Sequence, residues 1–264
     1  MLEIKNIYKT FNPGTINEKV ALNGLSLKLN EGDFVTVIGG NGAGKSTMLN
    51  AVAGVWPVDE GQIIIDGTDV TKLSEYKRAA YLGRVFQDPM TGTAATMGIE
   101  ENLALAKRRG KTRLLRPGIT KAERAEYKEL LKILNLGLED RLTSKVGLLS
   151  GGQRQALTLL MATLQKPKLL LLDEHTAALD PKTAAKVLDI TDKIVNRDHL
   201  TTLMITHNMK DAIAHGNRLI MMDAGRVVVD ISGEDKKKLT VPDLLALFSR
   251  ASGSDEANDK MLLS

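Results

Sequence analysis

The chain has 264 residues, of which 43% are hydrophobic and 26% charged, and its formal net charge is +4 at pH 7. This composition is that of an ordinary globular protein of one large domain or two small ones, and the charge is too small to indicate nucleic-acid binding by itself. Cysteine is absent, which excludes disulfides and thiolate metal sites and is compatible with the cytosol.

The N-terminus and the hydropathy pattern bear on targeting. The first five residues lack the apolar core of a signal peptide, and no apolar run approaches the roughly 18 residues needed to span a membrane. We therefore expect neither a leader peptide nor a spanning helix. Residues 250–264 are polar and are expected to form a loose tail.

The N-terminal part of the chain is predicted to be rich in β-strand. Residues 3–8 and 21–29 alternate apolar and polar side chains, and a turn at 12–14 separates them. Two aromatic residues, Tyr8 and Phe11, lie near this turn in a chain that is only 3% aromatic. One of them could stack on a nucleotide base, or both could be core residues.

A phosphate-binding loop is predicted next. Residues 39–47 fit the pattern G-x-x-x-x-G-K-[ST], between a buried strand at 34–38 and a helix at 46–53. Glycines let the backbone N–H groups face a phosphate, and the helix N-terminus adds a partial positive charge. Lys45 is expected to reach the β- and γ-phosphates and Ser46 to bind Mg²⁺, whereas a dinucleotide loop is disfavoured by the Gly-Lys-Ser ending. The residues expected to contact nucleotide here are Gly39, Asn41, Gly42, Ala43, Gly44, Lys45, Ser46 and Thr47.

Two more strands are predicted before the chain becomes helical. Residues 61–66 form one of them, followed by a hairpin turn at Asp66-Gly67. Residues 83–86 form the other, which ends at Gln87. A polar residue directly after a buried strand is a usual position for a site residue, although Gln87 could equally be an ordinary loop glutamine.

The segment from Met90 to Gly147 is predicted to be helical. A helix at 121–136 carries an apolar face, and Gly137 follows as its stop. A basic run precedes it at 107–116. This run could be a solvated loop or could contact anionic lipid head groups, while nucleic acid is a poorer third explanation because no aromatics interleave with the charges.

A second glycine-bearing helix start follows at Leu149-Ser150-Gly151-Gly152-Gln153. Ser150 is a good N-cap residue for an apolar helix that runs to about Gln165. The paired glycines leave backbone N–H groups uncovered. This helix start could therefore meet an anion, or it could be a simple cap.

Acidic residues end the next predicted strand, at 169–174. Asp173 is expected to hold Mg²⁺ through the coordination shell of the ion. Glu174 is expected to lie where water attacks a phosphate. Asp180 follows as the cap of a helix at 181–196, which is a sufficient structural reason for it. His207 ends a further strand at 201–206 and could be structural or functional. Two short strands at 217–231 and a small helix at 244–248 complete the chain.

In this order the motifs resemble those of the ATP-binding subunit of an ABC transporter, and the resemblance extends from Leu2 to about Ser232. Residues 149–153 are the LSGGQ signature letter for letter. Phe11, 34 residues before Lys45, fits the aromatic residue that stacks on adenine, which leaves Tyr8 as a packing residue. The remaining matches are the phosphate loop 39–47, the Q-loop glutamine Gln87, the acidic pair Asp173 and Glu174, the D-loop Ala178-Leu179-Asp180 and the switch histidine His207.

The resemblance implies an α/β fold of the P-loop NTPase type. Its expected parts are a RecA-like mixed sheet core, an N-terminal antiparallel β-subdomain, and an α-helical subdomain at about 90–160. These form one ATPase domain at 1–249, followed by the tail.

The resemblance also implies a head-to-tail dimer with two MgATP between the subunits. Each ATP would contact the phosphate loop of one chain and Ser150, Gly151, Gly152 and Gln153 of the other. Glu174 would activate or orient water, His207 would contact the γ-phosphate, Gln87 would touch Mg²⁺ and water, and Asp180 would communicate across the dimer.

Within this family, a single cassette without a span resembles a bacterial importer subunit at the cytoplasmic face of the membrane. Its implied partners are a second copy, permease subunits and an extracytoplasmic solute-binding protein. The stretches 88–97 and 173–180 resemble ATPases of tryptophan or tyrosine uptake. His175 stands where proline is common, and Gly40 where proline or serine is common; neither removes a chemical group, so activity should survive.

Two other functions remain as alternatives. One is an ABC ATPase that acts on DNA or the ribosome, but those relatives carry coiled-coil insertions, zinc cysteines or two fused cassettes, none of which is present here. The other is a regulatory P-loop protein without turnover, against which the presence of Glu174 and His207 argues. We therefore favour transport.

Overall fold

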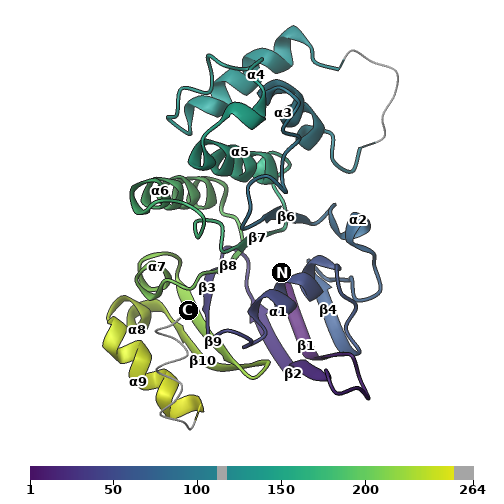
Figure 1. The fold of residues 1–264 in the computed structure, drawn as a ribbon, viewed down its shortest axis with the longest axis vertical. Coiled ribbons are helices and arrows are strands. Elements are labelled where there is room, and N and C mark those ends of the chain that lie inside the picture. The colour runs from purple at the N-terminus through teal and green to yellow at the C-terminus, as the bar shows by residue number, and fades with distance from the viewer. Residues whose placement is uncertain (112–117, 253–264) are drawn as a thin grey trace.

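A computed structural model of the protein describes residues 1–111 and 118–252, and its core is built on two sheets (Figure 1). The N-terminal sheet is antiparallel with strand order β2-β1-β4-β5. The central sheet has the order β10-β9-β3-β8-β7-β6, and all its neighbouring pairs are parallel except β10 with β9. The strands are β1 (Leu2–Phe11), β2 (Lys19–Leu29), β3 (Phe34–Ile38), β4 (Glu60–Ile65), β5 (Thr68–Asp69), β6 (Leu82–Val85), β7 (Leu169–Asp173), β8 (Thr202–Ile205), β9 (Arg218–Asp223) and β10 (Arg226–Ser232).

Helices cover the central sheet and extend from it (Figure 1). A group at one end of the molecule, α3, α4 and α5, forms a helical subdomain, and α7, α8 and α9 lie at the C-terminal side. The helices are α1 (Lys45–Ala53), α2 (Glu75–Arg78), α3 (Ile99–Lys107), α4 (Lys121–Lys132), α5 (Gly151–Thr163), α6 (Pro181–Asp198), α7 (Met209–Ala214), α8 (Gly233–Lys237) and α9 (Val241–Ser252), with a 3₁₀ turn at Val146–Leu148.

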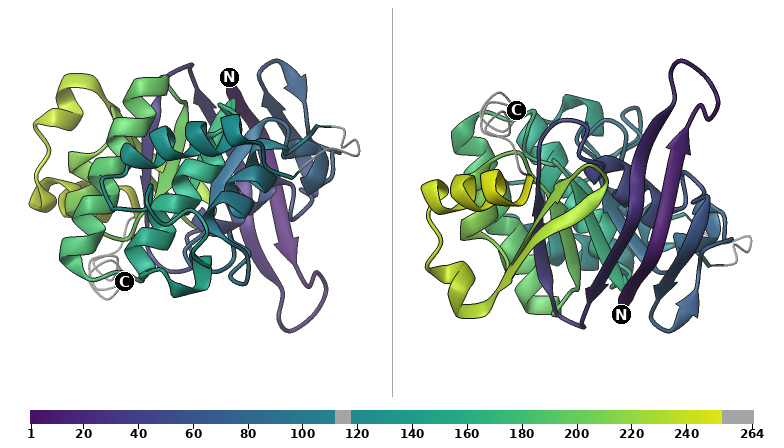
Figure 2. Two further views of the ribbon diagram at one scale, coloured as in Figure 1. Left: turned by 90° about the horizontal axis from the view of Figure 1, so that it is seen from above. Right: turned by 90° about the horizontal axis from the view of Figure 1, so that it is seen from below.

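The central strands β3 and β7 are largely apolar because both of their faces are covered. All five residues of β3 and the four leucines of β7 are buried, as expected for parallel strands covered on both faces. One core cluster joins α1 to both sheets, a second joins the helical subdomain and α6 to the central sheet, and a third lies under α7 and α9. The hairpin that links β1 and β2 extends beyond its sheet (Figure 2).

The expected fold class is confirmed, and several boundaries differ from the predictions. α4 ends at Lys132 rather than 136, because the chain turns there and Asn135 adopts a left-handed conformation with φ 50°. α9 is longer than the expected helix at 244–248 and crosses the expected start of the tail at residue 250. Residues 253–264 of that tail lie outside the described residues. Among the residues that the structure describes, no helix is both long and apolar enough to cross a membrane.

Candidate functional site

The predicted phosphate loop joins the end of β3 to the start of α1. Gly44 is the N-cap of α1 with φ 98°, and no side chain caps this helix end. A Cβ on Gly44 would lie 2.5 Å from the Ala21 carbonyl oxygen, and one on Gly39 would lie 2.3 Å from that of Met222. Both positions therefore require glycine. The loop leaves the N–H groups of the first helical turn free to face an anion.

A cavity of about 200 Å³ opens over this loop. Lys45 is only 7% exposed, and its Nζ donates to the carbonyl oxygens of Gly39 at 2.6 Å and Gly40 at 3.1 Å. Burial lowers the pKa of Lys45, and the nearby Glu174 carboxylate opposes that effect. The residues that line the cavity are Phe11, Lys19, Ala21, Asn41, Gly42, Ala43, Gly44, Lys45, Ser46, Thr47 and Glu174.

The carboxyl ends of three neighbouring strands bring the predicted catalytic residues to one edge of the sheet. Gln87, Glu174 and His207 follow β6, β7 and β8, which are adjacent in the sheet order. His207 Nδ1 lies 3.7 Å from Glu174 Oε2, and these side chains are 39% and 22% exposed. Glu174 has a left-handed backbone with φ 45°, which is uncommon for a residue with a Cβ. A carboxylate and an imidazole therefore stand together beside the phosphate loop, where water would attack.

Arg84, on β6, contacts the predicted metal ligand and was not singled out from the sequence. Its guanidinium donates to Asn50 Oδ1 at 2.8 Å and pairs with Asp173 Oδ2 at 3.4 Å, and it lies 4.5 Å from the centre of the Phe86 ring. Burial raises the pKa of Asp173, and the charge of Arg84 opposes that shift. Arg84 thus links α1, which begins at the phosphate loop, to the acidic end of β7.

The two N-terminal aromatics occupy different surroundings. Phe11 lines the cavity and packs edge-to-face on Trp56, with ring centres 4.9 Å apart and an interplanar angle of 81°. Tyr8 lies outside this cavity and packs on Gly24, where a Cβ would be 2.8 Å from the Tyr8 hydroxyl. Of these two aromatics, Phe11 is the one that lines the cavity, and Trp56, which the sequence did not indicate, packs against it.

The LSGGQ residues do not line the cavity. Ser150 and Gln153 form a reciprocal cap, in which Ser150 Oγ accepts from the Gln153 N–H at 3.3 Å and Gln153 Oε1 accepts from the Ser150 N–H at 3.1 Å. Gly152 packs so closely on Thr183 that a Cβ there would lie 2.1 Å from Thr183 Cγ2. Hydrogen bonds from Thr183 lower the pKa of Asp180, which caps α6. The signature helix start and the D-loop thus form a second cluster, separate from the phosphate loop within one chain.

His175, directly after Glu174, is buried rather than part of the open site. Its Nε2 lies 3.1 Å from Thr191 Oγ1 on α6, and burial lowers the pKa of His175 to about 4. At neutral pH the ring is therefore uncharged, and it anchors the segment after β7 to α6.

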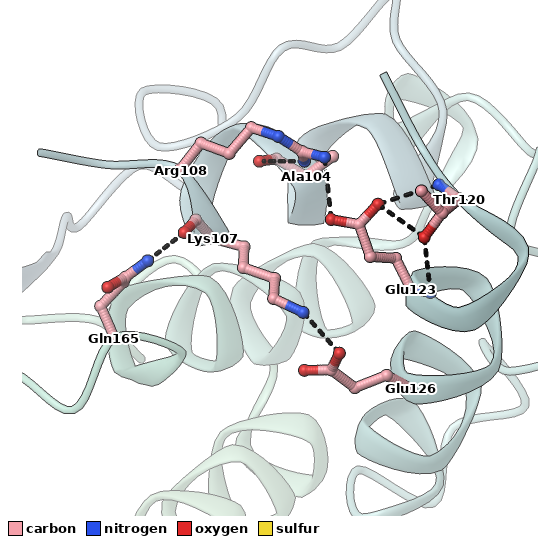
Figure 3. Close-up of polar contacts among 7 residues, drawn as sticks. All are labelled: Ala104, Lys107, Arg108, Thr120, Glu123, Glu126 and Gln165. Atoms are coloured by element: carbon pink, nitrogen blue, oxygen red, sulfur yellow. Dashed lines mark hydrogen bonds and ion pairs between the residues drawn. The ribbon is translucent and has the colours of Figure 1, made fainter. Parts of the chain in front are cut away.

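The first cations of the basic run are used inside the helical subdomain (Figure 3). Lys107 pairs with Glu126, and Arg108 pairs with Glu123 at 2.8 Å, both partners lying on α4. Arg109 donates to the Ala162 carbonyl oxygen at 3.4 Å. These contacts favour a structural role over lipid contact for the three residues. Residues 112–117 of the run lie outside the described residues.

A phosphate loop at a helix start, an acidic strand end and a histidine on the next strand define a P-loop nucleotide hydrolase. Comparison with known proteins then identifies the family within this class. The family model described as "ABC transporter" matches residues 22–177, and the chain belongs to this family. It is the ATP-hydrolysing subunit of an ABC transporter, as the resemblance of its motifs indicated.

Two relatives illustrate the range of similarity. The chain is 48% identical to a tyrosine transport ATP-binding protein of Clostridioides difficile over 257 residues, which cover 95% of this chain and 100% of that protein. It is 39% identical to the methionine import ATP-binding protein MetN of Rhizobium etli over 212 residues, which cover 79% of this chain but only 56% of that longer protein.

Solved structures of ATP-binding cassettes have the same fold as this chain. A dimeric ATP-binding cassette, MJ0796, bound to ADP and Pi in a post-hydrolysis state, shares 31% of residues with a TM-score of 0.74, over 88% of this chain and 98% of that one. The ADP conformation of another cassette, MJ1267, shares 26% with a TM-score of 0.76, over 94% of this chain and 98% of that one.

Proposed function

We propose that this chain drives the uptake of an amino acid, with tyrosine and tryptophan as the first solutes to test. The observation that carries the proposal is the 48% identity to a tyrosine transport protein from end to end of that relative. Other relatives are named for the import of methionine and of spermidine or putrescine, which supports import rather than export. The amino acid itself would be recognised by other subunits.

We infer the role of each catalytic side chain from its position at the cavity. Lys45, held over the loop carbonyls, moves its ammonium to the β- and γ-phosphates when ATP enters. Glu174 orients the attacking water and accepts its proton, and His207, at 3.7 Å from that carboxylate, contacts the γ-phosphate. Gln87, at the end of the neighbouring strand, touches the same water.

The residues present also fit Mg²⁺. Ser46, Gln87 and Asp173 offer a hydroxyl, an amide and a carboxylate, the hard oxygen donors that Mg²⁺ prefers. Few protein groups would hold the ion, and nucleotide phosphates would complete its coordination. When bound, Mg²⁺ would neutralise charge that develops on the phosphates.

We further propose that a complete site needs two chains. The phosphate loop and Phe11 line one cavity, while Ser150–Gln153 and Asp180 form a cluster outside it. A second copy placed head to tail would bring its signature helix start to the nucleotide of the first. The dimeric cassette of known structure, at 31% identity, supports this arrangement.

A role in transport implies that this subunit assembles with other proteins. The subunit would sit at the cytoplasmic face of the membrane with permease subunits and an extracytoplasmic solute-binding protein, and nucleic acid would not be a partner. We also propose that residues 1–249 act as one ATPase domain, with the helical subdomain at about 90–160 inserted in it.

Uptake by cells tests this proposal. Cells that lack this gene should lose accumulation of labelled tyrosine or tryptophan, and the wild-type gene should restore it while Glu174→Gln should not. Labelled methionine and putrescine serve as controls. Unchanged tyrosine and tryptophan uptake in the deletion, with loss of one of the controls, would overturn the solute assignment.

A further inference from the structure

Lys19, the first residue of β2, brings a second cation to the cavity over the phosphate loop. Its Nζ lies 3.6 Å from the point that a Cβ on Gly42 would occupy, so the ammonium stands directly over the middle of the loop. Lys19 and Lys45 line the same cavity of about 200 Å³ from different elements, one from β2 and one from α1.

The strand register fixes where along the cavity Lys19 lies. Phe11 on β1 pairs directly with Lys19 on β2, and directly opposed residues project from the same face of a sheet. Phe11 and Lys19 are therefore neighbours across the strand pair, and both side chains line the cavity. Glu174 also lines this cavity, and the terminal phosphate would react beside it.

The Lys19 ammonium is unpaired in the part of the chain that the structure describes. Among the described residues its ammonium makes no hydrogen bond or ion pair, and its side chain is exposed. Lys9, on the other side of Phe11, is different: its Nζ donates to Asp59 at 2.8 Å while lying 5.7 Å from the centre of the Phe11 ring. Of the two lysines beside Phe11, Lys9 is neutralised and Lys19 is available to an anion.

We propose that Lys19 binds the α- and β-phosphates of the nucleotide from the side opposite the phosphate loop. It clamps the part of the ligand that lies between the base on Phe11 and the γ-phosphate near Lys45 and Glu174. The contact is open to solvent and made by a flexible side chain, so its contribution is modest and sensitive to salt. This inference rests on the nucleotide site proposed above.

Nucleotide titrations of the full chain test the role of Lys19. Lys19→Gln should weaken ATP and ADP binding by the same factor, about three- to tenfold at low salt, and leave adenosine binding unchanged. Lys19→Arg should restore most of the affinity, and the difference from wild type should shrink at high salt. Lys28→Gln is the matched control, because Lys28 is an exposed lysine about 30 Å along the same strand and its loss changes the net charge equally.

Two results would overturn the proposal. Equal affinities of Lys19→Gln and Lys28→Gln for ATP and ADP would remove Lys19 from the site, and a loss confined to ATP would place it at the γ-phosphate instead. The nucleotide site itself is judged separately, from wild type and Lys45→Ala in the same titrations. If wild type binds ATP no better than Lys45→Ala, the site assignment fails whatever Lys19 does.

Discussion

Replacing Phe11 by alanine should weaken ATP binding without unfolding the protein. The ring lines the cavity over the phosphate loop, and it contacts Trp56 and Lys9. Stacking of a base on an aromatic side chain is worth about 1–3 kcal/mol, by analogy with nucleic-acid bases, which is about a five- to 150-fold change in Kd. Because Phe11 is only partly buried, the truncation should cost little stability.

Trp56 can report ATP binding through its intrinsic fluorescence. Trp56 is the only tryptophan in the chain, and its ring centre is 4.9 Å from that of Phe11. ATP that stacks on Phe11 should therefore change the intrinsic fluorescence of wild-type protein. Calorimetry then gives the Kd of Phe11→Ala on the same scale as wild type, without depending on that signal.

Tyr8→Ala is the matched control, since Tyr8 lies on the same strand but packs on Gly24 outside the cavity. Its ATP affinity should equal that of wild type. If Phe11→Ala binds ATP normally while Tyr8→Ala binds it weakly, the assignment of the stacking residue is wrong.

Three further predictions concern Lys45, Arg84 and His175. Lys45→Ala should bind ATP weakly and lower hydrolysis by a factor on the order of 10² or more; near-normal turnover at saturating ATP would contradict its role. Arg84→Met breaks the pair with Asp173 and the hydrogen bond to Asn50, so urea unfolding should show a loss of about 2–4 kcal/mol, and a loss below about 0.5 kcal/mol would refute this. Burial lowers the pKa of His175 in the folded protein to about 4, against an ordinary 6.5. The unfolded chain therefore binds a proton more readily, and the free energy of unfolding should fall by at most about 3 kcal/mol as the pH falls from 6.5 toward 4. Above pH 6.5 this loss is absent. Unfolding of His175→Gln should depend less on pH in that window, and identical slopes would exclude the effect.

The local parts of the site could be predicted from the sequence because each is a contiguous motif. The strand, glycine loop and helix at 34–53 lie almost where the pattern placed them, with α1 starting one residue earlier, at Lys45. The positions of Gln87, Glu174 and His207 followed from strand ends, since parallel neighbouring strands end at one edge of a sheet.

Contacts between distant segments could not be predicted in this way. Arg84 meets Asp173 across 89 positions of sequence, and nothing in the run around Arg84 indicates that contact. The glycine at 152 was explained by its free N–H groups, but the structure adds a packing reason, the contact with Thr183.

The number of cations in the basic run at 107–116 did not predict which of them form ion pairs in the fold. The cluster of lysines and arginines at 107–116 was interpreted as a solvated loop or as a surface for lipid, yet Lys107 and Arg108 pair with carboxylates on α4. Whether a cation is free depends on which acidic residues the fold brings beside it. Lys19 is the opposite case, because it belongs to no charged run and yet lines the cavity over the phosphate loop.

ATP is expected to join two copies of this chain, and its hydrolysis is expected to separate them. Glu174→Gln keeps the shape of the site but loses the carboxylate that orients and deprotonates water, so ATP should bind while turnover nearly stops. Adding Ser150→Arg should prevent association, because a bulky cation would block the seat of the γ-phosphate at the signature helix.

The decisive measurement is size-exclusion chromatography with light scattering on Glu174→Gln. ATP should convert this variant from monomer to dimer, ADP should leave it monomeric, and the variant that also carries Ser150→Arg should stay monomeric with ATP. A Glu174→Gln protein that binds ATP tightly yet remains monomeric at high concentration would contradict the sandwich for the isolated subunit.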